Sequence, residues 1–242
     1  RDHLYMGYLL MNLANLDTDQ GHYREAESRY IRALHIWERR LGPRHSSTAT
    51  CLANLGNCYS AQGRYAQAIS HLRRAQRIWQ EVLGEDNPLI AMALHNLAEV
   101  CVKQGNYRRA ETLFRRSLRL CETHLGLYHP NLRHPLGGLA DLYRVWGKYP
   151  EAMEYYKRAL RLSKKAFGLA HGKTAAILSG LAQLQEAQGR YEHARVLYER
   201  AVSLSPHVPK DVYQRFIALL SAMGRHEEAA QLETQLHEEG KP

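Results

Sequence analysis

The sequence has no long hydrophobic run and little cysteine, and each shortage excludes a class of protein. No stretch of the 242 residues approaches the roughly 18 consecutive apolar residues that suggest a membrane-spanning helix. We therefore expect no insertion into a membrane. The chain has only four cysteines, with no C-x-x-C pair: Cys51, Cys58, Cys101 and Cys121. This usage is typical of free thiols in a reducing compartment, so we expect a cytoplasmic location.

The start of the chain also lacks two common features. It has no initiator methionine, and no basic segment followed by an apolar one, as a secretory leader would have. The first residues are Arg1, Asp2 and His3. We expect the chain to be a segment of a larger polypeptide.

Motifs for catalysis, cofactors and metals are missing as well. The loop from Gly168 to Thr174 resembles a P-loop, but that motif needs four residues between its glycines and a preceding strand, and here there are three residues and a preceding helix. Thr174 is instead expected to cap the next helix. The fourteen histidines are scattered, with no pair at ligand spacing beside a third ligand. We predict a protein that is not an enzyme and uses no cofactor and no metal.

The sequence does contain a short motif, Gly-x-Tyr, that recurs every 42 residues. Its five glycines are followed by a degenerate sixth copy, 35 residues later: Gly21, Gly63, Gly105, Gly147, Gly189 and Gly224. An alanine stands five residues after each of these glycines, and leucines stand eleven and eight residues before each of the first five. A register this regular indicates one supersecondary unit repeated about six times.

The apolar spacing inside each unit predicts two helices joined by the glycine. Before the turn, apolar residues fall three apart, as in Leu52, Leu55 and Cys58, which marks one face of a helix. Glycine ends that helix because it adopts the left-handed conformation at little cost. After the turn, Ala68 and Leu72 restart the helical spacing. Each unit is therefore predicted to be a helical hairpin.

Small residues are expected where the two helices of a hairpin approach closely. They stand on both helices: Gly56, Ala98, Ala68 and Ala110. Cys58 and Cys101 also fall where the unit needs small apolar residues, and we expect them to be buried. Trp37 and Trp79 occupy the same position in successive second helices. We expect them to pack inside the fold, and the alternative is an exposed aromatic binding patch.

These residues match the tetratricopeptide pattern, and the chain resembles that family over its whole length. The 42-residue period, the Leu-Gly at the end of the long units, the His/Asn-Pro loops and the Asn-Leu-Ala tripeptides further resemble the kinesin-light-chain subfamily. The resemblance implies an all-α fold, a right-handed superhelical solenoid of about six helical hairpins. The whole chain, residues 1–242, is then a single solenoid with repeats at residues 4–42, 46–84, 88–126, 130–168, 172–206 and 209–238.

In such a solenoid the first helices line a concave groove. Residues nine and six positions before each turn glycine should face it, and five of them are asparagines: Asn12, Asn15, Asn54, Asn57 and Asn96. A carboxamide both donates and accepts hydrogen bonds, so this ladder suits the peptide groups of an extended ligand. Five further residues are expected to complete the groove: His95, Glu99, His134, Asp141 and Arg144. The alternative is that the asparagines only face water or bond the adjoining helix.

Glycine replaces the groove asparagine in the fourth and fifth repeats, at Gly138 and Gly180. Glycine in the middle of a helix costs about 1 kcal/mol relative to alanine. We hypothesise that these glycines leave the later groove wide and bare, and that a bulky element, either a ligand helix or a flanking segment of the same polypeptide, lies close to them. On this hypothesis, replacing them with alanine raises stability and weakens binding.

The formal net charge of +9 raises the question of an acidic partner. The basic surplus falls on the second helices, as in Arg73, Arg74 and Arg77, which in this fold form the outer wall. Single-stranded nucleic acid would need stacking aromatics interleaved with the charge. We do not expect nucleic-acid binding.

The function predicted from the sequence is a protein–protein interaction module that binds a peptide or protein segment in its concave groove. The alternative is a sensor or regulatory arm of a larger signalling protein, such as a nucleotide-switch ATPase, whose groove holds an internal segment. A third possibility is a scaffold that associates with copies of itself, and the sequence does not predict the oligomeric state.

Overall fold

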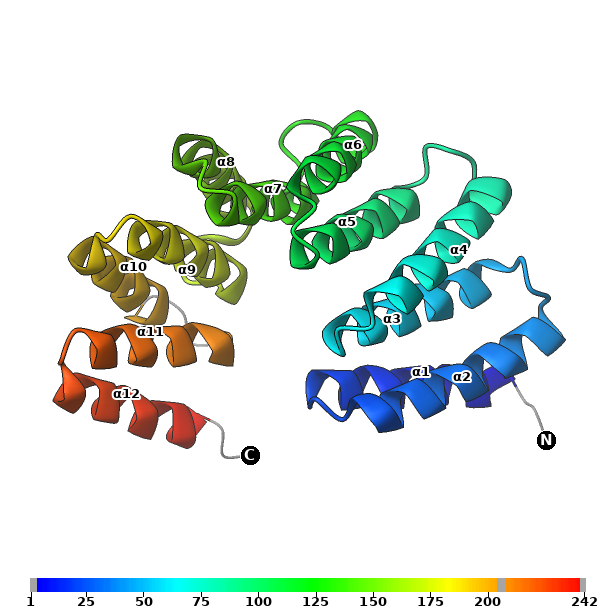
Figure 1. The fold of residues 1–242 in the computed structure, drawn as a ribbon, viewed down its shortest axis with the longest axis horizontal. Coiled ribbons are helices and arrows are strands. Elements are labelled where there is room, and N and C mark those ends of the chain that lie inside the picture. The colour runs from blue at the N-terminus through cyan, green and yellow to red at the C-terminus, as the bar shows by residue number, and fades with distance from the viewer. Residues whose placement is uncertain (1–3, 204–207, 240–242) are drawn as a thin grey trace. The chain divides into compact units, whose positions relative to one another are not determined.

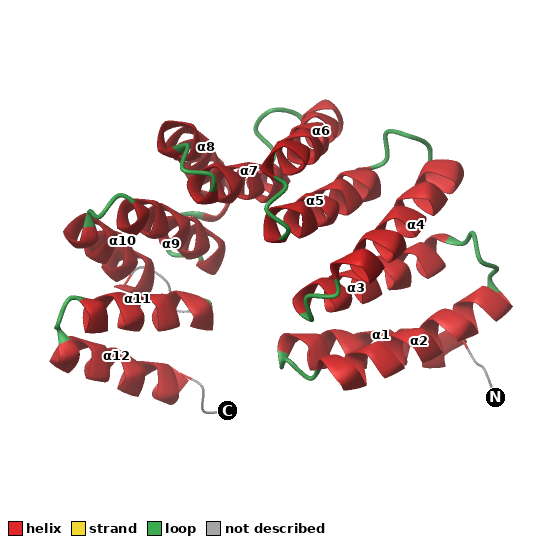
Figure 2. Ribbon diagram, viewed as in Figure 1, coloured by secondary structure: helices red, strands yellow, loops and turns green. Residues whose placement is uncertain are grey.

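The computed structural model describes residues 4–203 and 208–239, which form helices and loops with no strand (Figures 1 and 2). Within these ranges twelve α-helices and one 3₁₀ helix follow one another: α1 (Leu4–Asp19), α2 (Tyr23–Arg40), α3 (Ser46–Ala61), α4 (Tyr65–Leu83), α5 (Pro88–Lys103), α6 (Tyr107–Leu125), η1 (Pro130–Leu132), α7 (Arg133–Val145), α8 (Tyr149–Phe167), α9 (Gly172–Ala187), α10 (Tyr191–Ser203), α11 (Lys210–Ala222) and α12 (His226–Glu239). The predicted all-α class with six helical hairpins is confirmed. None of the helices described is both long and apolar enough to cross a membrane.

The chain divides into an N-terminal unit, Arg1–Gly126, and a C-terminal unit, Leu127–Pro242. The helix bounds fall within the predicted repeats, except that α12 extends one residue further. The end of the fifth predicted repeat, at residue 206, lies outside the described residues. That all six hairpins form one solenoid over residues 1–242 remains a prediction.

Each hairpin turns at a glycine in the left-handed conformation, as the sequence predicted. Gly63, between α3 and α4, has a φ of 75°, a value that strains any residue with a side chain. The N–H of Arg64 then donates to the carbonyl oxygen of Tyr59 at 2.9 Å, which satisfies a carbonyl at the end of α3. The phrase Gly-x-Tyr is thus the signature of this turn, and Tyr65 begins the second helix.

The loops between hairpins place a capping side chain at one register position, every 42 residues. In each case a side-chain atom accepts a hydrogen bond from the backbone N–H two residues later. The acceptor is Nδ1 of His45 at 3.1 Å, Oδ1 of Asn87 at 3.0 Å, Nδ1 of His129 at 3.2 Å and Nδ1 of His171 at 3.1 Å. These bonds satisfy a free N–H at the start of α3, α5, η1 and α9.

The fourth hairpin begins with the short 3₁₀ helix η1 before α7. Pro135 lies in the first turn of α7 and has no N–H to donate to the carbonyl four residues earlier, that of Asn131. A continuous α-helix from Pro130 would lack that bond, which explains the tighter 3₁₀ turn at this position.

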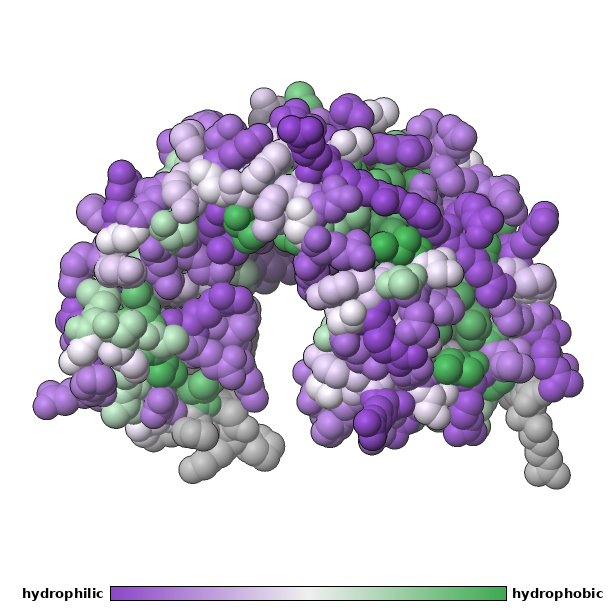
Figure 3. Space-filling model, viewed as in Figure 1, coloured by the Kyte–Doolittle hydropathy of each residue, from purple (hydrophilic) through white to green (hydrophobic). Residues whose placement is uncertain are grey.

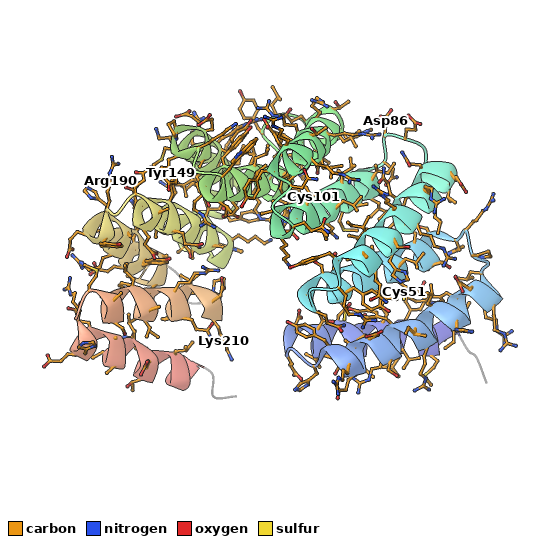
Figure 4. All side chains as sticks on the ribbon, viewed as in Figure 1. Cys51, Asp86, Cys101, Tyr149, Arg190 and Lys210 are labelled. Carbon is orange, nitrogen blue, oxygen red and sulfur yellow. The ribbon has the colours of Figure 1, made fainter. Side chains whose placement is uncertain are left out.

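The core of the N-terminal unit lies between its stacked hairpins. Trp37 and Trp79 are completely buried, so the expected packing role is confirmed and the exposed aromatic patch is wrong. Gly56 allows close approach within its hairpin, because a Cβ there would lie 2.8 Å from Cγ of Leu72. Cys58 and Cys101 are buried, as expected for small apolar residues. Cys51, labelled in Figure 4, lies on α3 and is buried as well, and burial raises the pKa of its thiol to about 12.

The C-terminal unit has a core of its own between α9, α10 and α11. The rings of Tyr198 on α10 and Phe216 on α11 stack with centroids 5.6 Å apart. Ala182, Ala194 and Ala201 are fully buried beside them and let the helices approach closely. This pairing joins the fifth and sixth hairpins through side chains at fixed register positions.

Candidate functional site

Asparagine side chains gather along the first helices of the N-terminal unit. Helix α3 packs beside both α1 and α5. We call the following residues of these three helices the asparagine face: Asn12, Asn15, Asn54, Asn57 and Asn96. The face is continuous between neighbouring hairpins, because Nδ2 of Asn54 donates to Oδ1 of Asn15 at 3.1 Å.

A tyrosine of the first hairpin holds one end of the asparagine face in place. The hydroxyl of Tyr30 on α2 donates to Oδ1 of Asn15 at 2.6 Å, so this oxygen accepts two hydrogen bonds. Burial raises the pKa of Tyr30 to about 12, and the hydroxyl therefore stays protonated and able to donate at neutral pH. The side chains of Asn15 and Asn54 are thus hydrogen-bonded within the protein. For these two residues the structure agrees with the alternative that the asparagines bond an adjoining helix.

The second hairpin lacks this tyrosine, and the side chain of Asn57, which stands 42 residues after Asn15, remains free. Leu72 stands 42 residues after Tyr30 and has no hydroxyl to donate. Asn57 is exposed and Asn96 is half-buried, and the side chain of neither has a hydrogen-bond partner among the described residues. Asn12 is exposed as well, and its side chain has no hydrogen-bond partner among the described residues. The carboxamides of Asn12, Asn57 and Asn96 are therefore the ones available to a ligand.

Charged and titratable groups of α5 stand beside these carboxamides. Nε2 of His95 lies 3.3 Å from Oε1 of Glu99, and the His95 ring packs edge-on against Phe114 with centroids 5.1 Å apart. Lys103, one turn after Glu99, donates to Oγ of Ser60 on α3 at 3.2 Å. The first helices thus present an acidic and a basic group next to the asparagine face.

The remaining predicted residues belong to the C-terminal unit, on α7. Oδ1 of Asp141 accepts hydrogen bonds from the Tyr156 hydroxyl at 2.6 Å and from Arg144 at 3.3 Å. Burial, and then the Asp141 carboxylate, raise the pKa of Tyr156. His134 is exposed on the same helix. Asp141 and Arg144 therefore form a bonded cluster with Tyr156 within the C-terminal unit. That this cluster and the asparagine face line one groove remains a prediction.

The hypothesis that Gly180 leaves a bare groove is wrong. A Cβ at Gly180 would lie 2.5 Å from Cε1 of Tyr156, on the second helix of the preceding hairpin. Gly180 is itself buried. The tyrosine ring of the protein occupies the space that a ligand element was expected to fill, and this contact offsets the cost of glycine in α9.

The glycine-rich loop before α9 has a structural role. The Thr174 hydroxyl donates to the carbonyl oxygen of Gly168 at 2.8 Å, which closes the loop. The N-cap of α9 is His171, so the prediction that Thr174 caps this helix is wrong. In the part of the chain that the structure describes, no three His, Cys, Asp or Glu side chains come together as a metal site would require.

The second helices of the N-terminal unit carry exposed arginines. Arg73 and Arg77 on α4, and Arg116 and Arg119 on α6, are all exposed to solvent. In the view of Figure 3 the surface over α2 and α4 is largely hydrophilic. This basic surface lies on different helices from the asparagine face.

Sequence reasoning missed two tyrosines that bond predicted site residues within the protein. Tyr30 and Tyr156 stand nine residues after their turn glycines, and both donate to the side chain six residues before the same glycine. Leu72 and Phe114 occupy that register position in the second and third hairpins. The presence of a tyrosine at this position in some hairpins and of an apolar residue in others was the signal that could have revealed these bonds.

Comparison with protein families gives one result over most of the chain. The family described as tetratricopeptide repeat matches at residues 5–78, 54–123, 110–165 and 131–206. Comparison with curated proteins gave no match at the level of the sequence.

Solved structures of other helical-repeat proteins are similar in fold. Nearly identical TPR-like repeats described as a kinesin light chain of Podosopora anserina match with a TM-score of 0.64 and 22% identity, over 84% of this chain and 97% of that chain. BtubC (BKLC) of P. vanneervenii matches with a TM-score of 0.67 and 17% identity, over 88% of each chain. Aspartyl phosphate phosphatase F of Bacillus subtilis matches with a TM-score of 0.65 and 16% identity, over 100% of this chain and 61% of that chain. At these identities the likeness concerns the fold alone.

Proposed function

Because this chain belongs to the tetratricopeptide-repeat family, a family of protein–protein interaction modules, we propose that it binds an extended peptide segment along its asparagine face and catalyses no reaction. The observation that carries the proposal is the pair of free carboxamides on neighbouring first helices, at Asn57 on α3 and Asn96 on α5. Asparagine has only a middling helix propensity, so its recurrence in mid-helix favours a role outside the helix.

The proposed recognition uses the backbone of the ligand. Each free carboxamide can donate to a carbonyl oxygen and accept from an N–H of an extended peptide, whatever its sequence. A hydrogen bond of this kind contributes about 0.5–1.5 kcal/mol net, so affinity would come from several carboxamides acting together. Glu99 and Lys103 lie one helical turn apart beside Asn96 and would favour ligand side chains of opposite charge.

Asn15 and Asn54 have a different part in this proposal. Since Oδ1 of Asn15 already accepts from Tyr30 and Asn54, these two carboxamides are fixed in orientation before a ligand arrives. Fixed groups lose less freedom on binding than free side chains do. We therefore expect Asn15 to offer its remaining N–H groups to the ligand, with its oxygen held inside.

The test is capture of partners from a cell lysate by three matched proteins. These are the parent chain, the double variant Asn57→Ala and Asn96→Ala, and a control with Arg73→Ala and Arg77→Ala on the outer side of α4. We expect the asparagine variant to lose a partner that the parent and the arginine control retain. Loss of the four hydrogen bonds that the two carboxamides can make corresponds to an affinity lower by at least about tenfold.

Two outcomes contradict the proposal. A partner that only the arginine variant loses would place the binding surface on the second helices. A partner that all three proteins capture equally would exclude both surfaces. Equal helicity of the variants, measured by circular dichroism, is required for either comparison.

A regulatory arm of a larger signalling protein is the second candidate function. Its support is the likeness in fold, over the whole of this chain, to aspartyl phosphate phosphatase F of Bacillus subtilis. On this candidate the asparagine face holds a segment of the same polypeptide. The longer polypeptide would then capture the partner less well than this chain does, whereas an independent module would capture it equally well in both forms.

A further inference from the structure

Helix α1 differs from the other first helices in the exposure of one apolar face. Leu9, Leu13 and Leu16 lie twelve, eight and five residues before the turn glycine, and they are 53%, 38% and 52% exposed. The residues at the same register positions of α3 are almost completely buried: Cys51 at 0%, Leu55 at 1% and Cys58 at 0%. The same register positions are therefore exposed in the first hairpin and buried in the second.

The same three positions are buried in the other hairpins too. Every one of the following residues is at most 9% exposed: Ala93, Leu97 and Val100 on α5, Ile177, Leu181 and Leu184 on α9, and Val212, Phe216 and Leu219 on α11. In each of these cases, as in α3, the second helix of the preceding hairpin packs against the first helix: α2 on α3, α4 on α5, α8 on α9, and α10 on α11. This face is therefore the surface on which a first helix receives a second helix.

The contact between α2 and α3 shows how close that packing is. Sγ of Cys51 donates to the carbonyl oxygen of Tyr30 at 3.3 Å, and Sγ of Cys58 to that of Tyr23 at 3.6 Å. At Leu9 and Leu16, the equivalent positions of α1, no described helix provides such a backbone. Among the described helices α1 packs only against α2 and α3, and Figure 1 shows the α1–α2 hairpin at the end of the N-terminal stack.

The composition of α1 is that of a buried helix. It has no charged residue from Leu4 to Leu16, and Tyr5 and Met6 add to the exposed apolar surface at 78% and 42%. A terminal helix that faces water needs a polar outer side. Helix α12 meets this requirement, with exposed Glu227 and Glu233, and α1 does not.

We propose that α1 receives the second helix of a further helical hairpin, which directly precedes α1 in the same natural polypeptide. The receiving surface is the one formed by Leu9, Leu13 and Leu16. The occupant is an amphipathic helix of the α2 type, with a large side chain that packs over Asn12, as Tyr156 packs over Gly180 at the same register position. This inference does not depend on the proposed peptide binding.

Two other occupants fit the surface less well. A second copy would have to associate through one helix of 16 residues, about 24 Å long. One helix of this length offers a narrow contact surface, whereas a stable interface buries roughly 800 Å² per partner. A covalently linked hairpin has the advantage of a high effective concentration. The chain's own last helix would place Glu233, the register equivalent of Tyr30, against the apolar surface, and a buried charge without a partner is strongly disfavoured.

The first test is the sequence of the polypeptide isolated from its source, read upstream of Arg1 by mass spectrometry. We expect a Gly-x-Tyr phrase whose glycine stands 42 residues before Gly21, followed five residues later by alanine. A natural polypeptide that starts at α1, or an upstream segment without this register, would overturn the proposal.

The second test adds a hairpin to the chain. A copy of residues 46–87 placed directly before Leu4 keeps the 42-residue spacing between Gly63 of the copy and Gly21. Hydrogen exchange of the α1 amides is compared between the parent, the extended chain, and the extended chain with Leu13→Glu and Leu16→Glu. We expect at least about tenfold slower exchange in the extended chain, and loss of that gain in the glutamate variant.

Two results of the second test would contradict the proposal. Equal exchange in the parent and the extended chain would show that the surface does not receive a hairpin. Sedimentation that reveals a dimer of the parent, abolished by Leu13→Glu and Leu16→Glu, would assign the surface to a second copy.

Discussion

At the scale of single residues, one register position has different neighbours in different hairpins. The position nine residues before the turn glycine holds Asn54 in the second hairpin and Gly180 in the fifth. Asn54 donates to Asn15, whereas Gly180 leaves room for the ring of Tyr156. The neighbour of this position comes from the preceding hairpin in both cases, from its first helix for Asn54 and from its second helix for Gly180.

The first prediction compares two glycines of the C-terminal unit. Gly180→Ala should lower the free energy of unfolding by about 1–3 kcal/mol, because its Cβ would lie 2.5 Å from Tyr156. Gly137→Ala is the matched control, since a Cβ there meets nothing within 4 Å. It should raise the free energy of unfolding by up to about 1 kcal/mol through helix propensity. Urea unfolding followed by circular dichroism measures both.

The opposite ranking of these variants would contradict the structure. If Gly180→Ala were the more stable of the two, the space beside Tyr156 would be open, and the earlier expectation of a bare groove would return. The double variant Gly180→Ala and Tyr156→Leu separates the causes, because it should recover part of the loss if the ring is the obstacle.

The candidate site shows where sequence reasoning stops at this scale. The register identified the positions of Asn57 and Asn96 without any structure, because the residue count from the turn glycine fixes the helix face. It could not show that Asn15 is bonded and Asn57 free. That difference depends on a hydroxyl of Tyr30, 15 residues away in sequence, which Leu72 lacks in the next hairpin.

At the scale of elements, side chains in the loops between hairpins cap the N-termini of α3, α5, η1 and α9. The sequence drew attention to these loops through their His/Asn-Pro pairs, but it did not assign the cap to His45 or Asn87. A histidine is an uncommon cap, since serine, threonine, aspartate and asparagine are the preferred residues. The acceptor role of Nδ1 depends on the orientation of the ring, which a sequence does not contain.

The second prediction tests the cap of α3. His45→Ala should lower the free energy of unfolding by about 0.5–2 kcal/mol, because the N–H of Ser47 loses its acceptor. His45→Asn should keep the stability or raise it, since Asn87 holds the equivalent position of the next loop. His35→Ala is the control, because His35 is exposed within α2, and it should change the stability by less than about 0.5 kcal/mol. Equal unfolding midpoints for His45→Ala and the parent would exclude a capping role.

At the scale of the whole molecule, the repeated register was sufficient to predict the fold class. Within each unit, the described helices of a hairpin contact only those of neighbouring hairpins, so a local pattern repeated along the chain determines which helices pair. The sequence could not predict the division into an N-terminal and a C-terminal unit at Gly126. The Leu-Gly that ends the third repeat is of the same kind as those that end the first and second.

The third prediction is that residues 1–126 fold alone. The buried cluster of this unit extends from Leu10 to Val100 and consists of its own residues, so the fragment contains the interfaces that stabilise its three hairpins. We expect a helical circular dichroism spectrum and a cooperative thermal transition. Leu55→Ala in the fragment should lower the free energy of unfolding by about 2–5 kcal/mol, because Leu55 is 1% exposed and its loss leaves a cavity. A disordered spectrum for the fragment would show instead that these hairpins need the residues after Gly126 to form their core.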